Sequence, residues 1–224
     1  MRLAALCVLI LAPQVLLPGA TDIASDHLRD GHRVERIFKG DSALGHFTYE
    51  WHTMPNGGLL LVTSGEVRSQ RFLDSSVVKR RGLAPVSEMA QFGNHVDHFT
   101  YDGSTVTRAR STTDSGTTRE THTYGLPVFS FQELDDLLRS LPLRDGYEAI
   151  LPLYSEGSDT LEMDTVRITG HTGATWTLRF ADPAIVGTYD VDERSRAIVR
   201  HESVGRKSGN VVRFQYSDLA EPGH

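Results

Sequence analysis

The 224-residue chain contains a single cysteine, Cys7, which lies in an apolar N-terminal stretch. Residues 1–20 have the pattern of a secretory signal peptide, with an apolar run from Leu3 to Leu17 and small residues up to Ala20. Cleavage after Ala20 would remove Cys7 and leave a mature chain without a thiol. Disulfide frameworks and thiol catalysis are therefore excluded for the mature protein.

The sequence also lacks an excess of basic residues, and it lacks a second long hydrophobic run. Lys and Arg total 23 against 29 acidic residues, which gives a net charge of −6. A mildly acidic chain without basic runs argues against nucleic acid as a partner. No later apolar stretch approaches the ~20 residues of a membrane span. We therefore expect a periplasmic or secreted protein of the bacterial cell envelope, with no membrane span after signal cleavage.

The common catalytic and nucleotide-binding motifs are missing as well. The chain has no G-x-S-x-G, no H-E-x-x-H, no P-loop and no G-x-G-x-x-G before a helix. Ser76 and Lys79 match S-x-x-K, but they lie in a β-branched segment where they would face opposite ways. The sequence therefore predicts no catalytic residue.

Histidines are frequent, ten in all, and seven of them belong to predicted strands. His95 and His98 would point to opposite faces of one strand. His46 and His52 share a face, but six residues of strand separate them by about 20 Å. The spacing predicts no metal site and no cofactor.

Turn residues recur about every ten positions, and the segments between them are rich in Val, Thr, Tyr and Phe. In residues 46–52 the aromatic side chains Phe47, Tyr49 and Trp51 alternate with His46, Glu50 and His52. Asn56-Gly57-Gly58 then predicts a hairpin turn in which Asn-Gly adopts positive φ angles. This pattern indicates a mainly β protein, either a curved antiparallel sheet or an open β-barrel.

One segment has helical rather than strand periodicity. Ser130 and Glu133 form a capping box, and Phe129 with Leu134 can form a hydrophobic staple. The apolar face that follows consists of Phe131, Leu134, Leu137, Leu138 and Leu141, and Pro142 ends the helix. We expect a short amphipathic helix over about 130–141, docked on the sheet.

No linker, low-complexity tract or internal repeat divides the chain. The predicted organisation is a signal peptide over 1–20, a loose N-terminal segment over 21–32, a single β-rich domain over 33–216 and a tail over 217–224.

Several motifs resemble a family of uncharacterised exported bacterial proteins, a domain of unknown function. They are Leu141-Pro142-Leu143 with Gly146-Tyr147, the Tyr101-Asp102-Gly103 turn and the hairpin from Tyr189 to Glu202. The resemblance spans about residues 33–216, and it departs from the family pattern at the turn before Trp176. It implies an open barrel with a helix against it, distantly similar to the envelope proteins that carry lipoproteins. It implies no catalytic residues.

Three functions remain open. The first is a non-catalytic envelope protein that binds an apolar or amphiphilic ligand, such as an acyl chain or a lipoprotein, in an open barrel. The second is a structural or interaction module with a filled core. The third is a hydrolase, which would be favoured if two or more of five side chains converge within hydrogen-bond reach: Glu50, His52, His98, His122 and His201. For the first function, we expect the ligand site to be lined by these side chains: Phe47, Tyr49, Trp51, Phe99, Tyr101, Leu134, Leu138, Trp176 and Phe180. The alternative is that they form an ordinary packed core.

Overall fold

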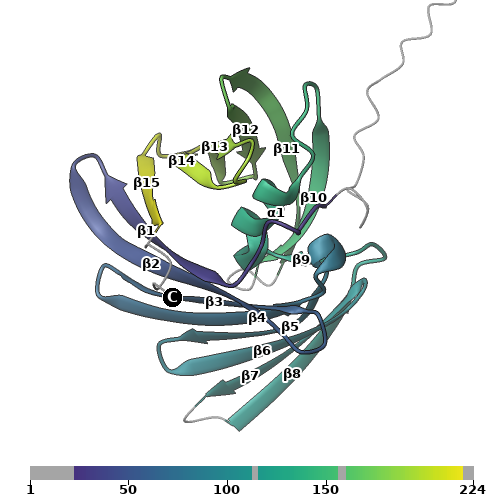
Figure 1. Ribbon diagram of the computed structural model, residues 1–224. Helices are drawn as coiled ribbons and strands as arrows, with labels where there is room; N and C mark the ends of the chain where they lie inside the picture. Colours follow the sequence, from purple (N-terminus) through teal and green to yellow (C-terminus); the bar gives the residue numbers. More distant parts are fainter. Residues whose placement is uncertain (1–22, 113–115, 156–159, 219–224) are drawn as a thin grey trace, which may run out of the picture.

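The computed structural model describes residues 23–112, 116–155 and 160–218 (Figure 1). The predicted signal peptide therefore lies outside the described residues. The first half of the chain forms eight strands and a short 3-10 helix: β1 (Gly31–Lys39), β2 (Ser42–Thr53), β3 (Leu59–Val67), β4 (Gln70–Val78), η1 (Arg81–Leu83), β5 (Pro85–Phe92), β6 (His95–Asp102), β7 (Thr105–Thr112) and β8 (Gly116–Thr123).

The second half begins with the helical segment and continues with strands. Its elements are β9 (Phe129–Ser130), η2 (Phe131–Glu133), α1 (Leu134–Ser140), β10 (Glu148–Ser155), β11 (Thr160–Thr172), β12 (Thr175–Ala181), β13 (Ile185–Asp192), β14 (Ile198–Gly205) and β15 (Val211–Asp218). No helix within the described ranges is long and apolar enough to cross a membrane.

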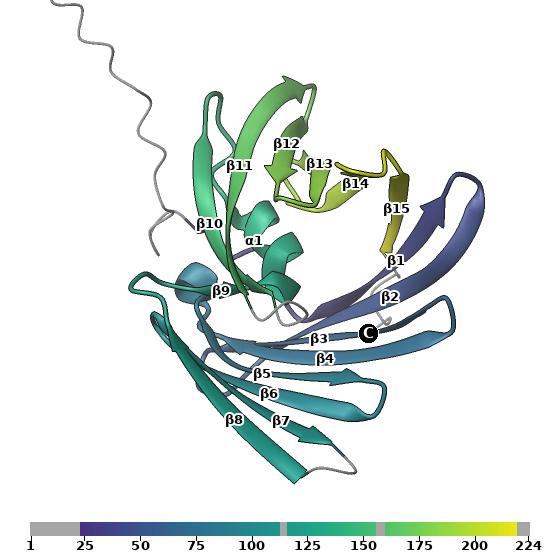
Figure 2. The same cartoon turned by 180° about the vertical axis from the view of Figure 1, so that it is seen from behind.

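All the strands belong to one 15-stranded sheet of order β8-β7-β6-β5-β4-β3-β2-β1-β15-β14-β13-β12-β11-β10-β9. Neighbours are antiparallel except β9, which pairs parallel with β10. Because β1 pairs with both β2 and β15, the two halves meet at the centre of the sheet. Figures 1 and 2 show them as two facing arcs with α1 between. The predicted mainly β fold, an unclosed curved sheet with one docked helix, is confirmed.

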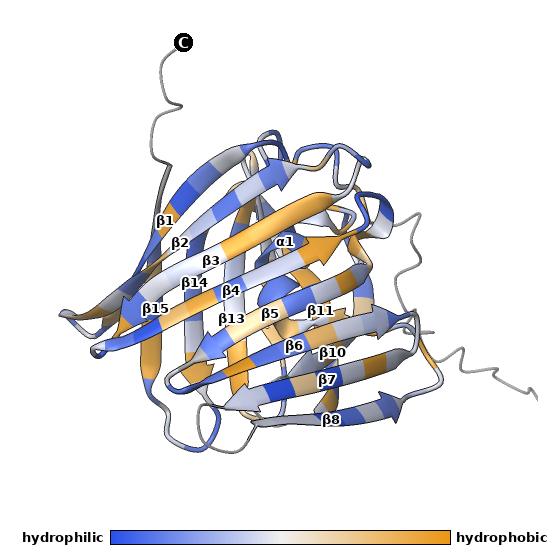
Figure 3. Cartoon of the chain, turned by 90° about the horizontal axis from the view of Figure 1, so that it is seen from below, coloured by the Kyte–Doolittle hydropathy of each residue, from blue (hydrophilic) through white to orange (hydrophobic). Residues whose placement is uncertain are grey.

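The strand alternation places the aromatic side chains on the inner face, as the sequence predicts. Trp51 on β2 is buried, whereas Glu50 and His52 point outward and contact each other at 3.3 Å with exposed side chains. Hydrophilic and hydrophobic bands alternate along β4 to β7 in Figure 3. The same period buries Trp176 and Phe180 on β12.

The turn between β2 and β3 differs in detail from the prediction. It spans the five residues 54–58, and the Met54 amide donates to the Gly58 carbonyl at 2.9 Å. Gly57 has a positive φ of 80°, but Asn56 does not. The Asn56 side chain instead accepts from the Gly58 amide at 3.0 Å. The hairpin is therefore present, but it is not the two-residue turn in which both Asn and Gly take positive φ.

The helical segment over 130–141 is confirmed, with η2 leading into α1. The Ser130 hydroxyl accepts from the Gln132 amide at 3.1 Å and caps the first turn. Leu134, Leu137 and Leu138 are buried, and Leu141 follows at the C-terminal end, before Pro142. These leucines join the main core between α1 and the two arcs.

A second, smaller core lies where the free ends of the arcs approach each other. Phe99 on β6 and Tyr154 on β10 are both fully buried, and their rings meet edge to face with centroids 5.7 Å apart. Val128, just before β9, packs in the same cluster. The sheet is thus unclosed in its hydrogen bonding, but side chains bridge its two ends.

Of the segment over 21–32 that the sequence predicts to be loose, residues 23–30 are described, and they are packed against the domain before β1 begins. Ile23 and Leu28 are buried in the main core, and the Ala24 amide donates to the Ser140 carbonyl at 2.9 Å. Burial of two large apolar side chains gives this segment a fixed place. At the other end, β15 extends two residues into the predicted tail, because Asp218 pairs with Arg33 on β1.

Gly65 on β3 occupies a position that excludes a larger side chain. A Cβ built there would lie 2.6 Å from Cδ1 of Phe47 and would also meet the His46 carbonyl. We expect Gly65→Ala to lower the free energy of unfolding by about 1–3 kcal/mol through overpacking. The matched control is Gly170→Ala on β11, where nothing lies within 4 Å. Urea unfolding measures both, and equal losses would contradict the close approach.

Candidate ligand-binding site

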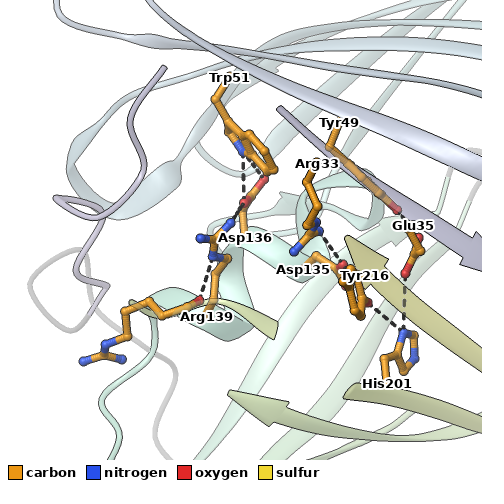
Figure 4. Close-up of polar contacts among 10 residues, drawn as sticks. Arg33, Glu35, Tyr49, Trp51, Asp135, Asp136, Arg139, His201 and Tyr216 are labelled. Carbon is orange, nitrogen blue, oxygen red and sulfur yellow. Dashed lines mark hydrogen bonds and ion pairs between the residues drawn. The ribbon is translucent and has the colours of Figure 1, made fainter. Parts of the chain in front are cut away.

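A buried polar cluster lies where α1 meets the inner face of the sheet (Figure 4). We call it the Arg33 cluster, and its members come from β1, β2, α1, β14 and β15: Arg33, Glu35, Tyr49, Asp135, His201 and Tyr216. The helix contributes Asp135 in its first turn, facing the sheet rather than solvent. The cluster therefore connects the helix to both arcs.

Arg33 is the central cation of the cluster and is 4 % exposed. Its Nη2 donates to Oδ2 of Asp135 at 3.0 Å. The guanidinium carbon lies 4.8 Å from the ring centre of Tyr49 and 4.5 Å from that of Tyr216, in cation–π geometry. Within the described residues, Nε and Nη1 of Arg33 have no hydrogen-bond partner. The charge is thus held by one carboxylate and aromatic faces.

Glu35 and His201 form the second part of the cluster. The Tyr49 hydroxyl donates to Oε2 of Glu35 at 2.6 Å, and Nδ1 of His201 lies 3.9 Å from Oε1. The same His201 nitrogen is 3.2 Å from the Tyr216 hydroxyl, which lies 3.3 Å from Oδ2 of Asp135. The imidazole is stacked on Tyr189, with centroids 3.9 Å apart, and its orientation is fixed.

The two carboxyl groups of the cluster have opposite pKa shifts. Burial works to raise the pKa of Glu35, but hydrogen bonds from His201, Tyr49 and Tyr216 outweigh it and hold that pKa below its ordinary value. Burial, with the nearby negative charge of Glu35, raises the pKa of Asp135. Burial also raises the pKa of Tyr49 well above 10, so its hydroxyl remains a donor near neutral pH.

A neighbouring contact docks the other side of α1. Nε1 of Trp51 donates to Asp136 at 3.1 Å, and Arg139 lies 3.7 Å from the same carboxylate.

His27, on the segment before β1, packs close to this end of the helix. Burial, followed by the positive charges of Arg139 and Arg196, lowers the pKa of His27 to about 3. His27 is therefore neutral at physiological pH.

Beside the Arg33 cluster, the inner face of β2 to β5 contains a pocket of about 180 Å³. Its lining consists of three aromatic rings and several smaller polar or apolar groups: Phe47, Tyr49, Thr63, Phe72, Leu73, Asp74, Gln91 and Gln132. Tyr49 belongs to both features, because its ring lines the pocket while its hydroxyl donates to Glu35. Glu35, Asp135 and His201 do not line this pocket.

The structure separates the nine residues that the sequence predicts as a ligand lining. Phe47 and Tyr49 line the pocket and are half-buried. The others are buried in a packed core: Trp51, Leu134, Leu138, Trp176 and Phe180 in the main core, and Phe99 and Tyr101 in the smaller one. The aromatic stripe of β2 thus runs from an open pocket into packed interior.

Among the hydrolase candidates, Glu50 and His52 converge within hydrogen-bond reach on β2, whereas His98, His122 and His201 lie on β6, β8 and β14. Glu50 contacts His52 on the exposed outer face, and His98 is exposed on β6. His201 is inside the Arg33 cluster. Among the described residues, no group of three or more His, Cys, Asp or Glu side chains could hold a metal ion.

Sequence reasoning missed most of the Arg33 cluster. Arg33 and Glu35 alternate with Val34 and Arg36, so both faces of β1 carry charge and the pattern does not identify the inner one. The usable signal was Ile37, which shares the face of Arg33 and Glu35 and is buried. Asp135 lies in the first turn of the helix, where an aspartate usually interacts favourably with the helix dipole at a solvent-exposed end.

The chain belongs to the family described as "Protein of unknown function (DUF3108)", whose model matches residues 38–199. The match includes the pocket lining and the helix, while Arg33, Glu35, His201 and Tyr216 lie outside it. No significant match to a curated protein was found.

The Arg33–Asp135 ion pair gives a stability prediction. Removing one partner of a buried pair leaves an uncompensated charge, so we expect Arg33→Leu to lower the free energy of unfolding by about 3–5 kcal/mol. The double variant R33L/D135L should recover much of this loss, because neither charge remains. Urea unfolding measures the free energies of unfolding in this double-mutant cycle. The control is Arg71→Leu, which breaks an exposed pair with Glu66 at 3.8 Å and should change little. A loss in R33L no larger than in R71L would contradict the assignment.

A second prediction concerns Asp164 on β11, which is fully buried and has no hydrogen-bond partner for either carboxyl oxygen among the described residues. Burial, then the charges of Asp182 and Glu162, raises its pKa from 3.8 to about 7. The folded state therefore binds the proton more tightly than the unfolded chain, and this group makes stability fall as pH rises from about 4 to 7.

We expect Asp164→Asn to flatten that part of the pH profile and to be more stable than wild type at pH 8, by about 1 kcal/mol or more. Unfolding free energies between pH 4 and pH 8 measure the effect. Asp41→Asn, at an exposed carboxylate, is the control. A D164N profile parallel to that of wild type would show that Asp164 is not the titrating group.

Proposed function

We propose that this protein is an exported, non-catalytic protein of the bacterial envelope that binds an apolar or amphiphilic ligand. The pocket at Phe47 and Tyr49 carries the proposal. Packed side chains fill the interior around α1, whereas three aromatic rings and Thr63 surround an opening of about 180 Å³. The lining is largely apolar with a few polar groups, as is usual for ligand sites.

The size of the pocket limits the part of the ligand that enters it. Sites for whole drug-sized ligands are about 300–1,000 Å³. A pocket of about 180 Å³ suits one end of an amphiphile, with the remainder along the inner face of the sheet. This differs from a carrier whose whole concavity shelters an acyl chain, because α1 and its leucines already fill the central space.

The signal-peptide pattern of residues 1–20 supports export. The exposed Glu50–His52 pair lies on the outer face and outside the pocket, so it gives the hydrolase alternative little support.

Native mass spectrometry of protein purified from the envelope tests this proposal. We expect a co-purifying amphiphile, released by organic extraction, and a protein mass that lacks residues 1–20. Dodecanol, dodecanoate and dodecyltrimethylammonium then probe the emptied protein by thermal shift. At least one should stabilise it, because a ligand that binds only the folded state raises its stability.

Thr63→Phe provides the matched variant, since Thr63 lines the pocket and a phenyl ring would fill it. Ser64→Phe, at the next residue on the outer face of β3, is the control. Loss of the shift in T63F but not in S64F is expected. A bare protein mass, with no shift from any of the three amphiphiles, would rule out the binding function and favour the interaction module.

A further inference from the structure

The two ends of the open sheet differ in how their backbone edges are covered. At one end, β9 has only two residues, both buried, and it leads directly into η2. At the other end, β8 has eight residues and is the outermost strand of the arc formed by β1 to β8 (Figure 1). Among the described strands, β8 pairs with β7 alone. The described part of the sheet therefore has one long strand edge without a neighbouring strand.

β8 lacks the features that usually protect such an edge. Natural edge strands are shortened, bulged, or carry proline and lysine, because unpaired backbone groups recruit other strands. β8 has no proline or lysine, and its pairing with β7 continues through eight residue pairs without a bulge. Seven of its eight residues are exposed and His122 is half-buried, so solvent reaches both faces of the strand. Another strand can therefore reach this edge without displacing a packed core.

The hydrogen bonds between β7 and β8 determine which backbone groups point outward. In an antiparallel pair, residues that bond to the partner strand alternate with residues that point away from it. The Tyr124 amide donates to the Ser104 carbonyl at 2.9 Å, so Tyr124 and every second residue before it face β7. The intervening residues direct their amide and carbonyl groups toward the outer edge; they are Thr117, Arg119, Thr121 and Thr123. The edge thus presents the alternating donors and acceptors that one more antiparallel strand requires.

The charges of β8 fit a second copy of the same strand in one register. An antiparallel pair around a two-fold axis can centre on Arg119, Glu120 or Thr121. Centring on Arg119 opposes two guanidinium groups, and centring on Glu120 opposes two carboxylates; both arrangements are destabilising. Centring on Thr121 opposes Glu120 to His122 of the second copy, at both symmetry-related positions, and no like charges are directly opposed. Charge therefore favours the register centred on Thr121.

The same register continues a contact that β7 and β8 already make. On their outer face, the hydroxyls of Thr107 and Thr121 lie 3.0 Å apart, and those of Thr105 and Thr123 lie 3.1 Å apart. In the two-fold pair, Thr121 faces Thr121 of the second copy, so the row of threonines crosses from one copy to the other. Cross-strand threonine pairs are favourable. Side-chain hydroxyls and charges therefore favour the same register.

From these observations we infer that two copies of this chain associate through β8, antiparallel and centred on Thr121. The two sheets then become one continuous sheet, and the outward backbone groups of each β8 are paired. The association goes beyond the proposed ligand binding and does not depend on it, because β8 contributes no residue to the lining of the pocket.

Sedimentation equilibrium of the full chain tests the association. We expect a reversible dimer with a dissociation constant of about 10 µM, because the pairing of two strand edges gives a small interface. Thr121→Pro should raise this constant at least about tenfold, since the proline ring removes the outward N–H at the centre and leaves the bonds to β7 intact. Thr121→Val is the matched control. It also loses the hydroxyl contact with Thr107, but it keeps the N–H and should still dimerise.

A cysteine at the centre of the register tests the geometry without a proline variant. Directly opposite residues of a hydrogen-bonded pair have Cα atoms about 5.5 Å apart, which is within the range of a disulfide. In a Cys7→Ser background the introduced cysteine is the single thiol. Under mild oxidation, T121C should form the disulfide-linked dimer at least about tenfold faster than R119C or E120C, because this register places Arg119 and Glu120 farther from their own copies.

Three results would overturn the inference. The first is a purely monomeric mass at about 200 µM protein, where a dimer of the expected affinity would predominate. The second is a dimer that persists unchanged in T121P, because the copies would then meet at another surface. The third is crosslinking of T121C no faster than that of R119C and E120C. Each leaves the proposed ligand binding standing, whereas an intact dimer that binds no amphiphile removes the proposed function alone.

Discussion

The docking of α1 against the inner face of the sheet is the contact on which the rest of the structure depends. An unclosed sheet that curves must cover the apolar side chains of its concave face. The leucines of α1 do this between the two arcs, and Asp135 and Asp136 attach the helix to Arg33 and Trp51. Without the helix, the arcs would face each other across exposed hydrocarbon, and η2, which leads into α1, would no longer hold Gln132 at the pocket wall.

Tyr49 joins the two polar features of the interior. Its ring belongs to the pocket, and its hydroxyl fixes Glu35 in the Arg33 cluster. A group in the pocket therefore contacts a side chain whose orientation is set by the same network that positions α1. The rigid wall of the pocket follows from this network, because a phenol bound at both ring and hydroxyl has few alternative rotamers.

Much of the fold could be predicted from the sequence, because the signals were local. Period-two alternation in β2 and β12 and the cap and leucine spacing of α1 specify element type and inner face directly. The Arg33 cluster could not be predicted, since Arg33, Asp135 and Tyr216 are far apart in the chain and their types resemble surface residues. On the aromatic stripe of β2, Phe47 and Tyr49 line the pocket, but Trp51, two residues on, is packed against α1. Period-two alternation predicts which face of the sheet a side chain occupies, but not which element packs against that face.

The pairing of β1 with β15 has a consequence for how the molecule is made. β1 and β15, the first and last of the described strands, are neighbours at the centre of the sheet, so the backbone hydrogen bonds between the two arcs form only once β15 is in place. Until then each arc has an unpaired edge, which is a template for wrong partners. Pairing across almost the whole chain is slow, because a long loop must close before its contacts stabilise it. The joining of the two arcs through β1 and β15 is therefore a late step in folding.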